Sequence, residues 1–425
     1  MIRKTFLTIL PLLAATLILS ACGGKEKSGG GEPEPEDDSY VLSPFKGTRV
    51  RLNTADPCLV YQNGIFYMTM TGTSNIALIF DTDLSKLTSS AHPVENSLVY
   101  RSAEDPSVEE FFGEGAVLNG TWSPELHYLS EDDCPGYSGW YLYFALRLQN
   151  EAGNSADVRT VVLKSLSNRP SGPYAGPVDK VSNHTQALLD KDGNVINEWA
   201  VGPSVLRIPS GKYKGTYLTW VDEVGRGMGL GNFYQRLRIA KMGKPWQLAS
   251  EASTITTPTQ DWEKKGASST HPWVVEGGTA VYGDHGEIYL AYCGSGYWSD
   301  YGLGQLTLKM EDGDYADPLK TESWIKYENN PVFSSVTSES LRGAGHAFFL
   351  KDDKGNRFMC YHAYPYVNGV KEKSRNAYIE PYTIDYDAVS ETAPLGVLRM
   401  GLLGNGVAAP TYSNIEFYIN AKYRK

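Results

Sequence analysis

A hairpin pattern that returns five times is the feature that most limits how this chain can fold. Each copy is a short apolar strand, a polar turn and a second strand rich in aromatic residues. Such runs of β-branched and aromatic residues between turn residues are typical of strands, and helical periodicity is nearly absent. The copies are CLVYQNGIFYMTMT, LHYLSEDDCPGYSGWYLYFA, VLRIPSGKYKGTYLTWV, AVYGDHGEIYLAYC and AFFLKDDKGNRFMCYHA, and they start at Cys58, Leu126, Val205, Ala280 and Ala347.

The spacing of these copies predicts a series of sheets. Successive copies begin about 65 to 80 residues apart, roughly the length of one four-stranded sheet with its loops. Five sheets in series indicate an all-β fold, a five-bladed β-propeller. A β-sandwich or a pair of β domains is the competing interpretation, but neither predicts so long a repeat.

The first 39 residues are expected to lie outside this fold. Residues 1–21 have a positive start and an apolar run that is short for a membrane-spanning helix, which is typical of a signal peptide. The segment Leu19-Ser20-Ala21-Cys22 resembles the lipobox of bacterial lipoproteins, so Cys22 would carry the lipid anchor; an ordinary secretory signal is the alternative. Residues 22–39 are rich in Gly, Pro and Glu and indicate a flexible tether. We therefore expect a propeller over 40–425, exported and held to a membrane by lipid, at the outer membrane, the periplasmic face or the cell surface.

Net charge and cysteine spacing limit which binding partners and metal sites are possible. The formal net charge is −10, which argues against nucleic acid, because that binding needs Lys and Arg to neutralise phosphates. A neutral carbohydrate is compatible with it. Four cysteines besides Cys22 are not spaced as a zinc site, and disulfides or buried free thiols are both compatible with export. They are Cys58, Cys134, Cys293 and Cys360.

The residues just before each hairpin are the candidate functional residues. In a propeller the innermost strand of every blade lines the central channel, so equivalent positions converge at one end of it. Polar side chains precede four of the five hairpins. We expect these four to share one pocket: Asp56, Glu125, Glu276 and His346.

Two carboxyl groups across a sugar-sized pocket can hydrolyse a glycosidic bond. One gives a proton to the leaving oxygen and the other draws a proton from water, with about 6.5 to 9.5 Å between them in inverting enzymes. Glu276, beside Val275 and two glycines, is suited to be the acid, because apolar neighbours raise the pKa of a carboxyl group. Asp56, which precedes Pro57 at the start of its strand, is suited to be the base.

The order of the motifs from about Leu52 to Asp387 resembles glycoside hydrolase family 43. The matching segments are ADPCLVYQNGIFYMT, TWSPELHYL with GWYLYFA, VVEGGTAVYGDHGEIYLAYCGSG, DYGLGQLTL, DPLKTESWIK with PVF, RGAGHAFFL, YHAYP and SRNAYIEPYTIDYD. The resemblance implies a five-bladed propeller that cleaves arabinose-, xylose- or galactose-containing plant polysaccharides or oligosaccharides with inversion and no required cofactor.

The resemblance also implies roles for particular residues. Asp56 matches the general base and Glu276 the general acid. His346 matches a channel histidine that, in some members, lies beside a calcium ion or its water. Trp122 and Glu125 match a motif that lines the sugar pocket, and Arg375 matches a basic residue of the last inner strand.

An aromatic residue outside these motifs is a further candidate for sugar binding. Trp298, in a Gly-Ser-Gly-Tyr-Trp loop, is suited to stack on the apolar face of a sugar ring. Trp122 and Tyr297 are weaker candidates for the same role, because aromatic residues are also common in cores.

One departure from the family pattern bears on activity. Members carry an aspartate that tunes the acid, in the sequence Trp-Ala-Ile-Asp-Gly-Thr-Val-Leu, and Gly202 stands at its place in Trp199–Leu206. Glu125, Asp222 and Glu223 are the candidates to replace it. The alternative function is a carbohydrate-binding propeller with impaired catalysis.

Overall fold

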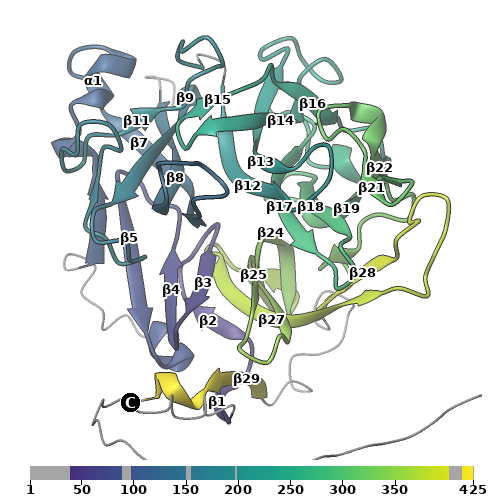
Figure 1. The fold of residues 1–425 in the computed structure, drawn as a ribbon. Helices are drawn as coiled ribbons and strands as arrows, with labels where there is room; N and C mark the ends of the chain where they lie inside the picture. Colours follow the sequence, from purple (N-terminus) through teal and green to yellow (C-terminus); the bar gives the residue numbers. More distant parts are fainter. Residues whose placement is uncertain (1–38, 89–96, 150–154, 197–198, 402–413, 425) are drawn as a thin grey trace, which may run out of the picture. The chain divides into compact units, whose positions relative to one another are not determined.

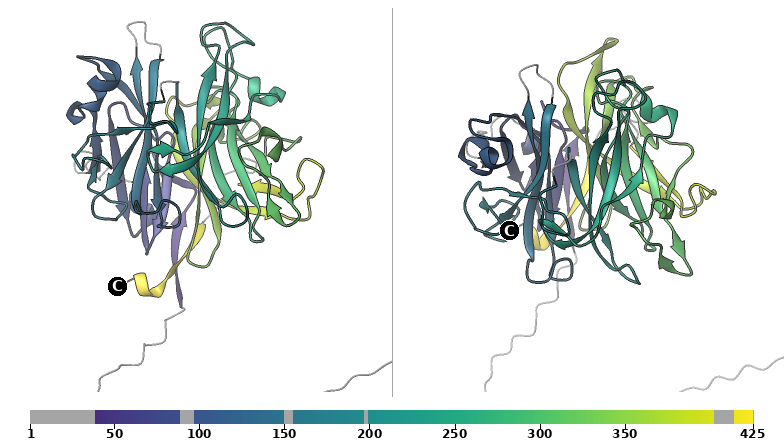
Figure 2. Two further views of the ribbon diagram at one scale, coloured as in Figure 1. Left: turned by 45° about the horizontal axis from the view of Figure 1, so that its top comes forward. Right: turned by 90° about the horizontal axis from the view of Figure 1, so that it is seen from above.

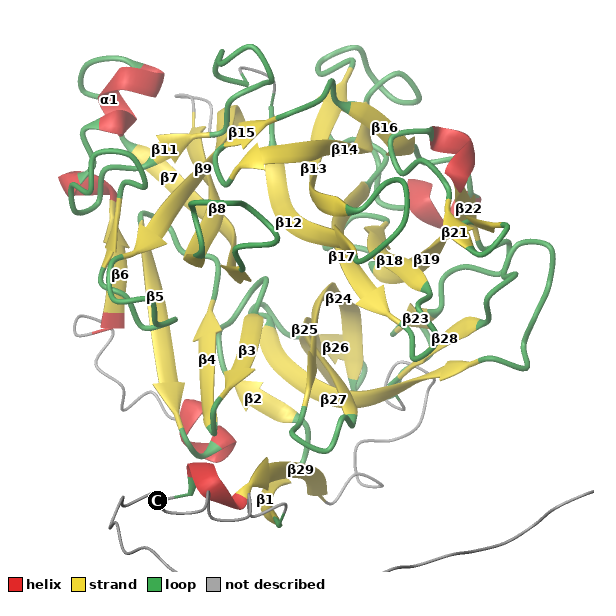
Figure 3. Cartoon of the chain, in the orientation of Figure 1, coloured by secondary structure: helices red, strands yellow, loops and turns green. Residues whose placement is uncertain are grey.

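Five antiparallel sheets follow one another along the chain in the computed structural model, which describes residues 39–88, 97–149, 155–196, 199–401 and 414–424 (Figure 1). The expected signal peptide (1–21), Cys22 and the expected tether up to residue 38 lie outside the described residues. Strands account for nearly all of the regular structure (Figure 3). The all-β prediction is confirmed.

The first three sheets begin at the first three predicted hairpins. The first has the order β3 (Cys58–Gln62), β4 (Ile65–Thr69), β5 (Asn75–Asp81), β6 (Leu98–Arg101). The second has β7 (Leu118–Leu129), β8 (Gly139–Gln149), β9 (Ser155–Ser165), β10 (Tyr174–Ala175), with β11 (Gln186–Ala187) on β9. The third has β12 (Val201–Ile208), β13 (Gly215–Val224), β14 (Tyr234–Lys244), β15 (Gln247–Leu248), with β16 (Ser253–Thr256) on β14.

The last two sheets complete the series. The fourth has the order β17 (Val275–Tyr282), β18 (Ile288–Gly294), β19 (Gly302–Leu308), β22 (Trp324–Lys326), with β23 (Phe333–Ser334) on β19. The fifth has β24 (Leu341–Lys351), β25 (Arg357–Val367), β27 (Asn376–Asp385), β2 (Arg49–Arg51), with β26 (Val370–Lys371) on β25 and β28 (Val397–Met400) on β27. Because β2 comes from the start of the fold, it ties the first blade to the last.

The remaining elements are short. One two-stranded sheet pairs β1 (Tyr40–Lys46) with β29 (Asn414–Asn420), and another pairs β20 (Met310–Glu311) with β21 (Asp314–Tyr315). The helix α1 covers Ser107–Phe112, and 3₁₀ turns cover Leu84–Thr88, Ser102–Glu104, Asp261–Lys264, Thr321–Ser323 and Ala421–Tyr423. No helix among the described residues has the length and apolar character needed to cross a bilayer.

The innermost strands form a closed ring. β3 contacts β7, β7 contacts β12, β12 contacts β17, β17 contacts β24, and β24 returns to β3. Figure 1 shows β3, β12, β17 and β24 around the centre of the fold, and Figure 2 gives two further views of the same sheets. The described chain is therefore a five-bladed β-propeller, as the repeat predicts.

The core lies between neighbouring blades. Five apolar clusters are buried, each dominated by residues of two adjacent sheets. The aromatic residues of the second hairpin strands supply much of this packing, among them Phe66, Phe144, Trp220, Tyr289 and Tyr361. The four cysteines of the fold are buried free thiols, so the disulfide alternative does not apply to them.

Candidate active site

One residue with a left-handed backbone lies in, or just before, every inner strand. Its φ angle is +50° at Asp56, +50° at Ser123, +62° at Gly202, +61° at Gly277 and +51° at His346. In the second to fifth sheets this residue lies where the strand register breaks, and such β-bulges turn side chains out of the normal alternation. The bulges therefore aim the residue at this position, or the one before it, at one end of the channel.

A cavity of about 800 Å³ opens at that end. Six of the predicted site residues line it together, although they come from four different blades: Asp56, Trp122, Glu276, Trp298, His346 and Arg375. Tyr297 lines it as well. The cavity is large enough for a sugar residue together with part of its neighbour.

Glu125 is the exception, because it does not line this cavity. It lies two residues past Ser123, after the bulge, where the strand has returned to regular pairing with Tyr143. Its carboxylate is buried in the fold, and Oε2 lies 2.7 Å from Nε2 of His127. The expectation that Glu125 belongs to the sugar pocket is therefore wrong. The Glu125 carboxylate is paired with the imidazole of His127 instead.

Asp56 is surrounded by donors and positive charge. The Thr71 hydroxyl donates to its Oδ2 over 2.5 Å. Its Oδ1 lies 3.2 Å from Nδ1 of His362, 3.5 Å from Nη1 of Arg375 and 3.7 Å from Nδ1 of His346. The Asp56 backbone N–H also donates to Nδ1 of His362. These contacts fix the carboxylate at the cavity floor.

The electrostatics of this cluster favour an ionised Asp56. Burial alone would raise the pKa of Asp56, but His346, a hydrogen bond with His362 and the Arg375 guanidinium lower it well below its ordinary value. Burial and the charge of Arg375 in turn lower the pKa of His362 to about 3, so this imidazole is neutral at physiological pH. Asp56 is therefore ionised before the reaction. Because its pKa is so low, it takes a proton from water only while that water attacks the substrate, as a general base does.

Glu276 has the opposite tendency. Burial raises its pKa, a hydrogen bond from Tyr301 and the charge of His346 partly offset this, and the negative charge of Asp56 raises it further. The Tyr301 hydroxyl donates to Oε1 of Glu276 over 2.7 Å. The cavity thus holds one carboxyl group whose pKa is lowered and one whose pKa is raised, which is the direction of difference that acid–base hydrolysis needs.

The three candidates to replace the aspartate missing at Gly202 differ in their surroundings. Asp222 is buried and bound by Arg236 (2.6 Å) and Arg238 (2.8 Å), so its charge is already neutralised. Glu125 lies outside the cavity, as described above. Glu223 lines the cavity together with Glu276.

Aromatic rings and guanidinium groups form one wall of the cavity. Arg147 lies over Trp122 at 4.8 Å from the ring centroid, and Arg375 lies over Tyr297 at 4.6 Å. The Trp298 ring is 4.7 Å from that of His271. Trp298 is fixed by a hydrogen bond from its Nε1 to the backbone oxygen of Gly266. Such rigid rings suit stacking on a sugar face.

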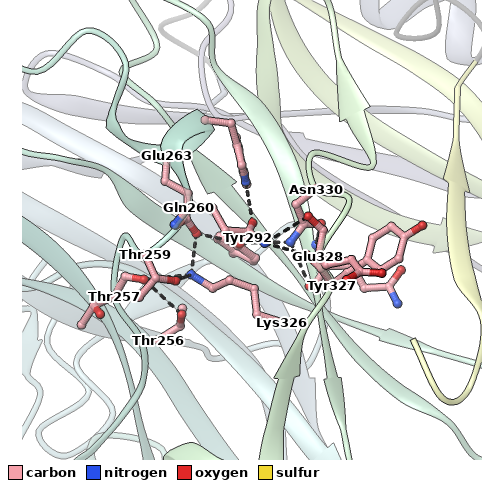
Figure 4. A network of polar contacts seen from close by, with 12 residues as sticks. Thr256, Thr257, Thr259, Gln260, Glu263, Tyr292, Lys326, Tyr327, Glu328 and Asn330 are labelled. Atoms are coloured by element: carbon pink, nitrogen blue, oxygen red, sulfur yellow. Dashed lines mark hydrogen bonds and ion pairs between the residues drawn. The ribbon is translucent and has the colours of Figure 1, made fainter. Parts of the chain in front are cut away.

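A buried ion pair supports the loop that completes the cavity rim, which includes residues 269–272. Oε1 of Glu263 accepts hydrogen bonds from Nζ of Lys326 (2.6 Å) and from the Tyr292 hydroxyl (2.8 Å), as Figure 4 shows. The backbone oxygen of Glu263 accepts from the amides of Val274 and Ser295. The network therefore ties the loop before β17, which carries Glu276, to the fourth blade.

Several residues at this site were not singled out from the sequence. Tyr301 lies in the motif DYGLGQLTL and His362 in YHAYP, both of which were matched as segments without a role for these side chains. Arg147 lies in the second strand β8 and Thr71 follows the end of the second strand β4, so no pattern before the hairpins could identify them. Their roles depend on contacts between blades, which a linear motif does not show.

A directly bound metal does not fit the residues that the structure describes. No group of three or more His, Cys, Asp or Glu side chains among them is arranged as a metal site. His346 has Asp56 as its carboxylate neighbour. A calcium ion held near His346 through water stays a prediction.

Comparison with known proteins decides the family. A family model described as glycosyl hydrolases family 43 matches residues 49–389. The chain belongs to glycosyl hydrolases family 43. Asp56, Glu276 and all other residues that line the cavity lie inside the matched range.

Two curated proteins are similar over part of their length. The chain is 29% identical over 252 residues to an extracellular exo-α-(1→5)-L-arabinofuranosidase of Streptomyces avermitilis, covering 57% of this chain and 42% of that protein. It is 27% identical over 265 residues to α-L-arabinofuranosidase 43 of Humicola insolens, covering 61% and 46%. The chain thus spans less than half the length of these relatives.

Solved structures of family 43 proteins share the fold. An α-L-arabinofuranosidase from Lactobacillus brevis superposes with a TM-score of 0.58 at 23% identity, over 83% of this chain and 95% of that one. A thermostable family-43 glycoside hydrolase gives 0.56 at 16% identity, over 83% and 94%. At these identities the likeness supports the propeller alone.

Proposed function

We propose that this chain is a glycoside hydrolase that cleaves arabinose-, xylose- or galactose-containing plant polysaccharides or oligosaccharides with inversion. One observation carries the proposal: Asp56 and Glu276 line the same cavity, and their surroundings shift their pKa values in opposite directions. The cationic cluster lowers the pKa of Asp56, and burial raises the pKa of Glu276. Membership of family 43 supports the same reaction class.

The proposed reaction uses the two carboxyl groups once each. Glu276 gives its proton to the glycosidic oxygen as the bond from that oxygen to the anomeric carbon breaks. Asp56 takes a proton from a water molecule, whose oxygen forms the new bond to the anomeric carbon from the opposite face. Water is consumed, the configuration at the anomeric carbon is inverted, and later proton exchange with solvent restores Glu276 and Asp56.

Arabinofuranosides are the first substrates to test, because both curated relatives are named as arabinofuranosidases. The purified protein would be incubated with aryl α-L-arabinofuranoside and aryl β-D-xyloside, and with arabinan, xylan and galactan. Released sugars would be separated by chromatography, and ¹H NMR of early time points would give the first-formed anomer. We expect release of one sugar class with inverted configuration; retention would contradict the mechanism.

A carbohydrate-binding propeller with impaired catalysis is the second candidate, and the absence of a side chain at Gly202 favours it. It would bind arabino- or xylo-oligosaccharides in calorimetry without turnover. The variant Gly202→Asp separates the two, because Asp56 shows that aspartate is compatible with the same backbone conformation. A large gain in rate in this variant would support the binding candidate.

Export and lipid anchoring are part of the proposal. The lipobox-like segment ending at Cys22 supports them. Expression in a bacterium with radiolabelled palmitate would label the wild-type protein and leave Cys22→Ala unlabelled. Label in both proteins would contradict the anchor at Cys22. A water-mediated structural calcium near His346 would be tested by the change in Tm on adding a chelator, and no step of the proposed reaction uses it.

A further inference from the structure

The β-bulge in the fifth blade takes the backbone of His346 out of the ladder of its own sheet. The register of β24 with β25 breaks on both sides of Gly345, and His346 has no partner on β25. Its backbone is left-handed, with a φ angle of +51°. A residue with a Cβ atom adopts that conformation at a cost in free energy, and a backbone N–H that leaves the ladder needs another acceptor. A contact from outside the fifth sheet is therefore needed to hold this turn.

The thiol of Cys293 supplies this contact. Cys293 lies on β18, the second strand of the fourth blade, and its Sγ accepts a hydrogen bond from the His346 backbone N–H over 3.1 Å. The residue is 0% exposed and its thiol is free. The proposed reaction gives this thiol no task. The hydrogen bond crosses from one blade to the next, so it fixes the His346 turn relative to the fourth blade.

The same kind of contact recurs at two other junctions between blades. The backbone N–H of Ser123, where φ is +50°, donates to Oγ1 of Thr71 over 2.9 Å. The backbone N–H of Asp56, where φ is also +50°, donates to Nδ1 of His362 over 3.1 Å. Each acceptor comes from the second strand of the preceding blade in the ring, or from the turn just after that strand.

Glycine occupies the other two left-handed positions. The φ angles of Gly202 and Gly277 are +62° and +61°. Glycine has no Cβ atom and adopts this conformation without strain, so these two turns do not need to be held by a side chain. A side-chain acceptor is thus present at all three of the left-handed positions whose residue carries a Cβ atom. This correlation indicates that the acceptors stabilise the strained turns.

Cys293 links the strand of the proposed acid to the surroundings of the proposed base. It stands opposite Glu276 in the register of β17 with β18. Nδ1 of His346, whose backbone it holds, lies 3.7 Å from Oδ1 of Asp56. A Cβ atom at Gly277 would lie 3.2 Å from Nδ1 of His346 and 3.5 Å from Sγ of Cys293. The thiol, the imidazole and the backbone after Glu276 therefore pack closely, and a shift of the turn would move the imidazole relative to Asp56.

We propose that Cys293 is a positioning residue, whose sulfur holds the left-handed turn at His346 and thereby fixes the imidazole beside Asp56. The inference rests on the proposed function, because it takes Asp56 as the general base. The sulfur acts only as a hydrogen-bond acceptor and takes part in no covalent or redox step.

The variants Cys293→Ala and Cys293→Ser test this by comparing kcat with KM. Alanine removes the acceptor, and serine retains one. We expect kcat of Cys293→Ala to fall about tenfold while KM stays within about threefold, because a misplaced group at the reacting centre affects the transition state more than binding. In Cys293→Ser, kcat should stay within about threefold of the wild type. A wild-type kcat in Cys293→Ala, or an equal loss of kcat in both variants, overturns the inference.

Cys360→Ala is the matched control. Cys360 is also a free thiol that is 0% exposed, and it is not one of the residues that line the cavity. Its replacement removes the same atom from the core, so it reproduces the loss of packing without the loss of the His346 contact. We expect kcat of this variant to stay within about twofold of the wild type. A loss as large as that of Cys293→Ala would assign the effect to packing and overturn the inference.

A second measurement does not depend on turnover. Crystal structures of the wild type and of Cys293→Ala would give the position of the His346 imidazole relative to Asp56. We expect it to move by about 1 Å, the scale at which misplacement costs rate, and an unmoved imidazole overturns the inference. If the wild type hydrolyses no glycoside, the proposed function fails while these structures still decide the positioning. If the wild type is active and Cys293→Ala keeps its kcat, the inference fails and the function stands.

Discussion

The hydroxyl of Tyr301 donates a hydrogen bond to Oε1 of Glu276 over 2.7 Å, and the Tyr301 ring lies parallel to that of His362 at 5.6 Å. His362 in turn contacts Asp56. A single aromatic residue therefore touches the proposed acid and the imidazole that supports the proposed base. This contact stabilises the ionised form of Glu276, so it opposes the effect of burial on the pKa of Glu276.

Removing the hydroxyl of Tyr301 should move the alkaline limb of the pH profile. In Tyr301→Phe the hydrogen bond that lowers the pKa of Glu276 is lost, so this pKa rises. Because Glu276 must be protonated to act, the alkaline limb of kcat/KM should move to higher pH. The ring packing is retained, and the loss of stability should stay near 1 kcal/mol. A limb that moves to lower pH would contradict the role of Tyr301.

The acid limb of the pH profile of kcat/KM should depend on Arg375. Its guanidinium lies 3.5 Å from Oδ1 of Asp56 and helps to lower the pKa of that carboxyl group. In Arg375→Met the pKa of Asp56 should rise, so the ionised base is lost at a higher pH and the acid limb of kcat/KM moves up by about one pH unit. Arg399→Met, at an exposed pair with Asp385, is the control. An acid limb that stays in place would show that Arg375 does not tune Asp56.

The buried pair of Glu263 and Lys326 should matter for stability. The two side chains are 0% and 14% exposed, and their charged atoms lie 2.6 Å apart. Lys326→Met leaves the Glu263 charge buried without its partner, which should lower the free energy of unfolding by about 3 to 5 kcal/mol. Denaturant unfolding and Tm would measure it.

The control for this pair is Lys264, whose partner Asp261 is fully exposed. Lys264→Met should change the free energy of unfolding by less than about 1 kcal/mol. The double variant Glu263→Gln with Lys326→Met should recover part of the loss, because no unpaired charge remains. Equal effects of Lys326→Met and Lys264→Met would mean that burial of the pair has no energetic role.

The fold could be predicted from the sequence because the repeat is local. Each hairpin has its own turn residues and alternation, and five similar hairpins can bury their faces only against one another. Asp56, Glu276 and His346 could be placed for the same reason. Each lies at, or next to, the residue with left-handed backbone that recurs in or just before the inner strands. The shared position turned three distant residues into neighbours.

Residues beyond that position could not be placed in the same way. Glu125 was assigned to the pocket because it directly precedes the second hairpin, but the bulge ends before it and regular alternation turns it toward His127. Glu223 was one of three candidates to replace the charge missing at Gly202. It differs from Asp222 because it lines the cavity, whereas Asp222 is bound by Arg236 and Arg238. Register between strands and contacts across blades decide such cases, and the linear sequence does not contain them.

The most direct test of the proposed chemistry is kcat/KM of Asp56→Asn and Glu276→Gln on the best substrate found for the wild type. We expect each variant to fold with a Tm near that of the wild type and to lose at least about a thousandfold in kcat/KM, because each lacks one of the two proton transfers. If both variants keep kcat/KM within about tenfold of the wild type, Asp56 and Glu276 are not the acid and base of this propeller.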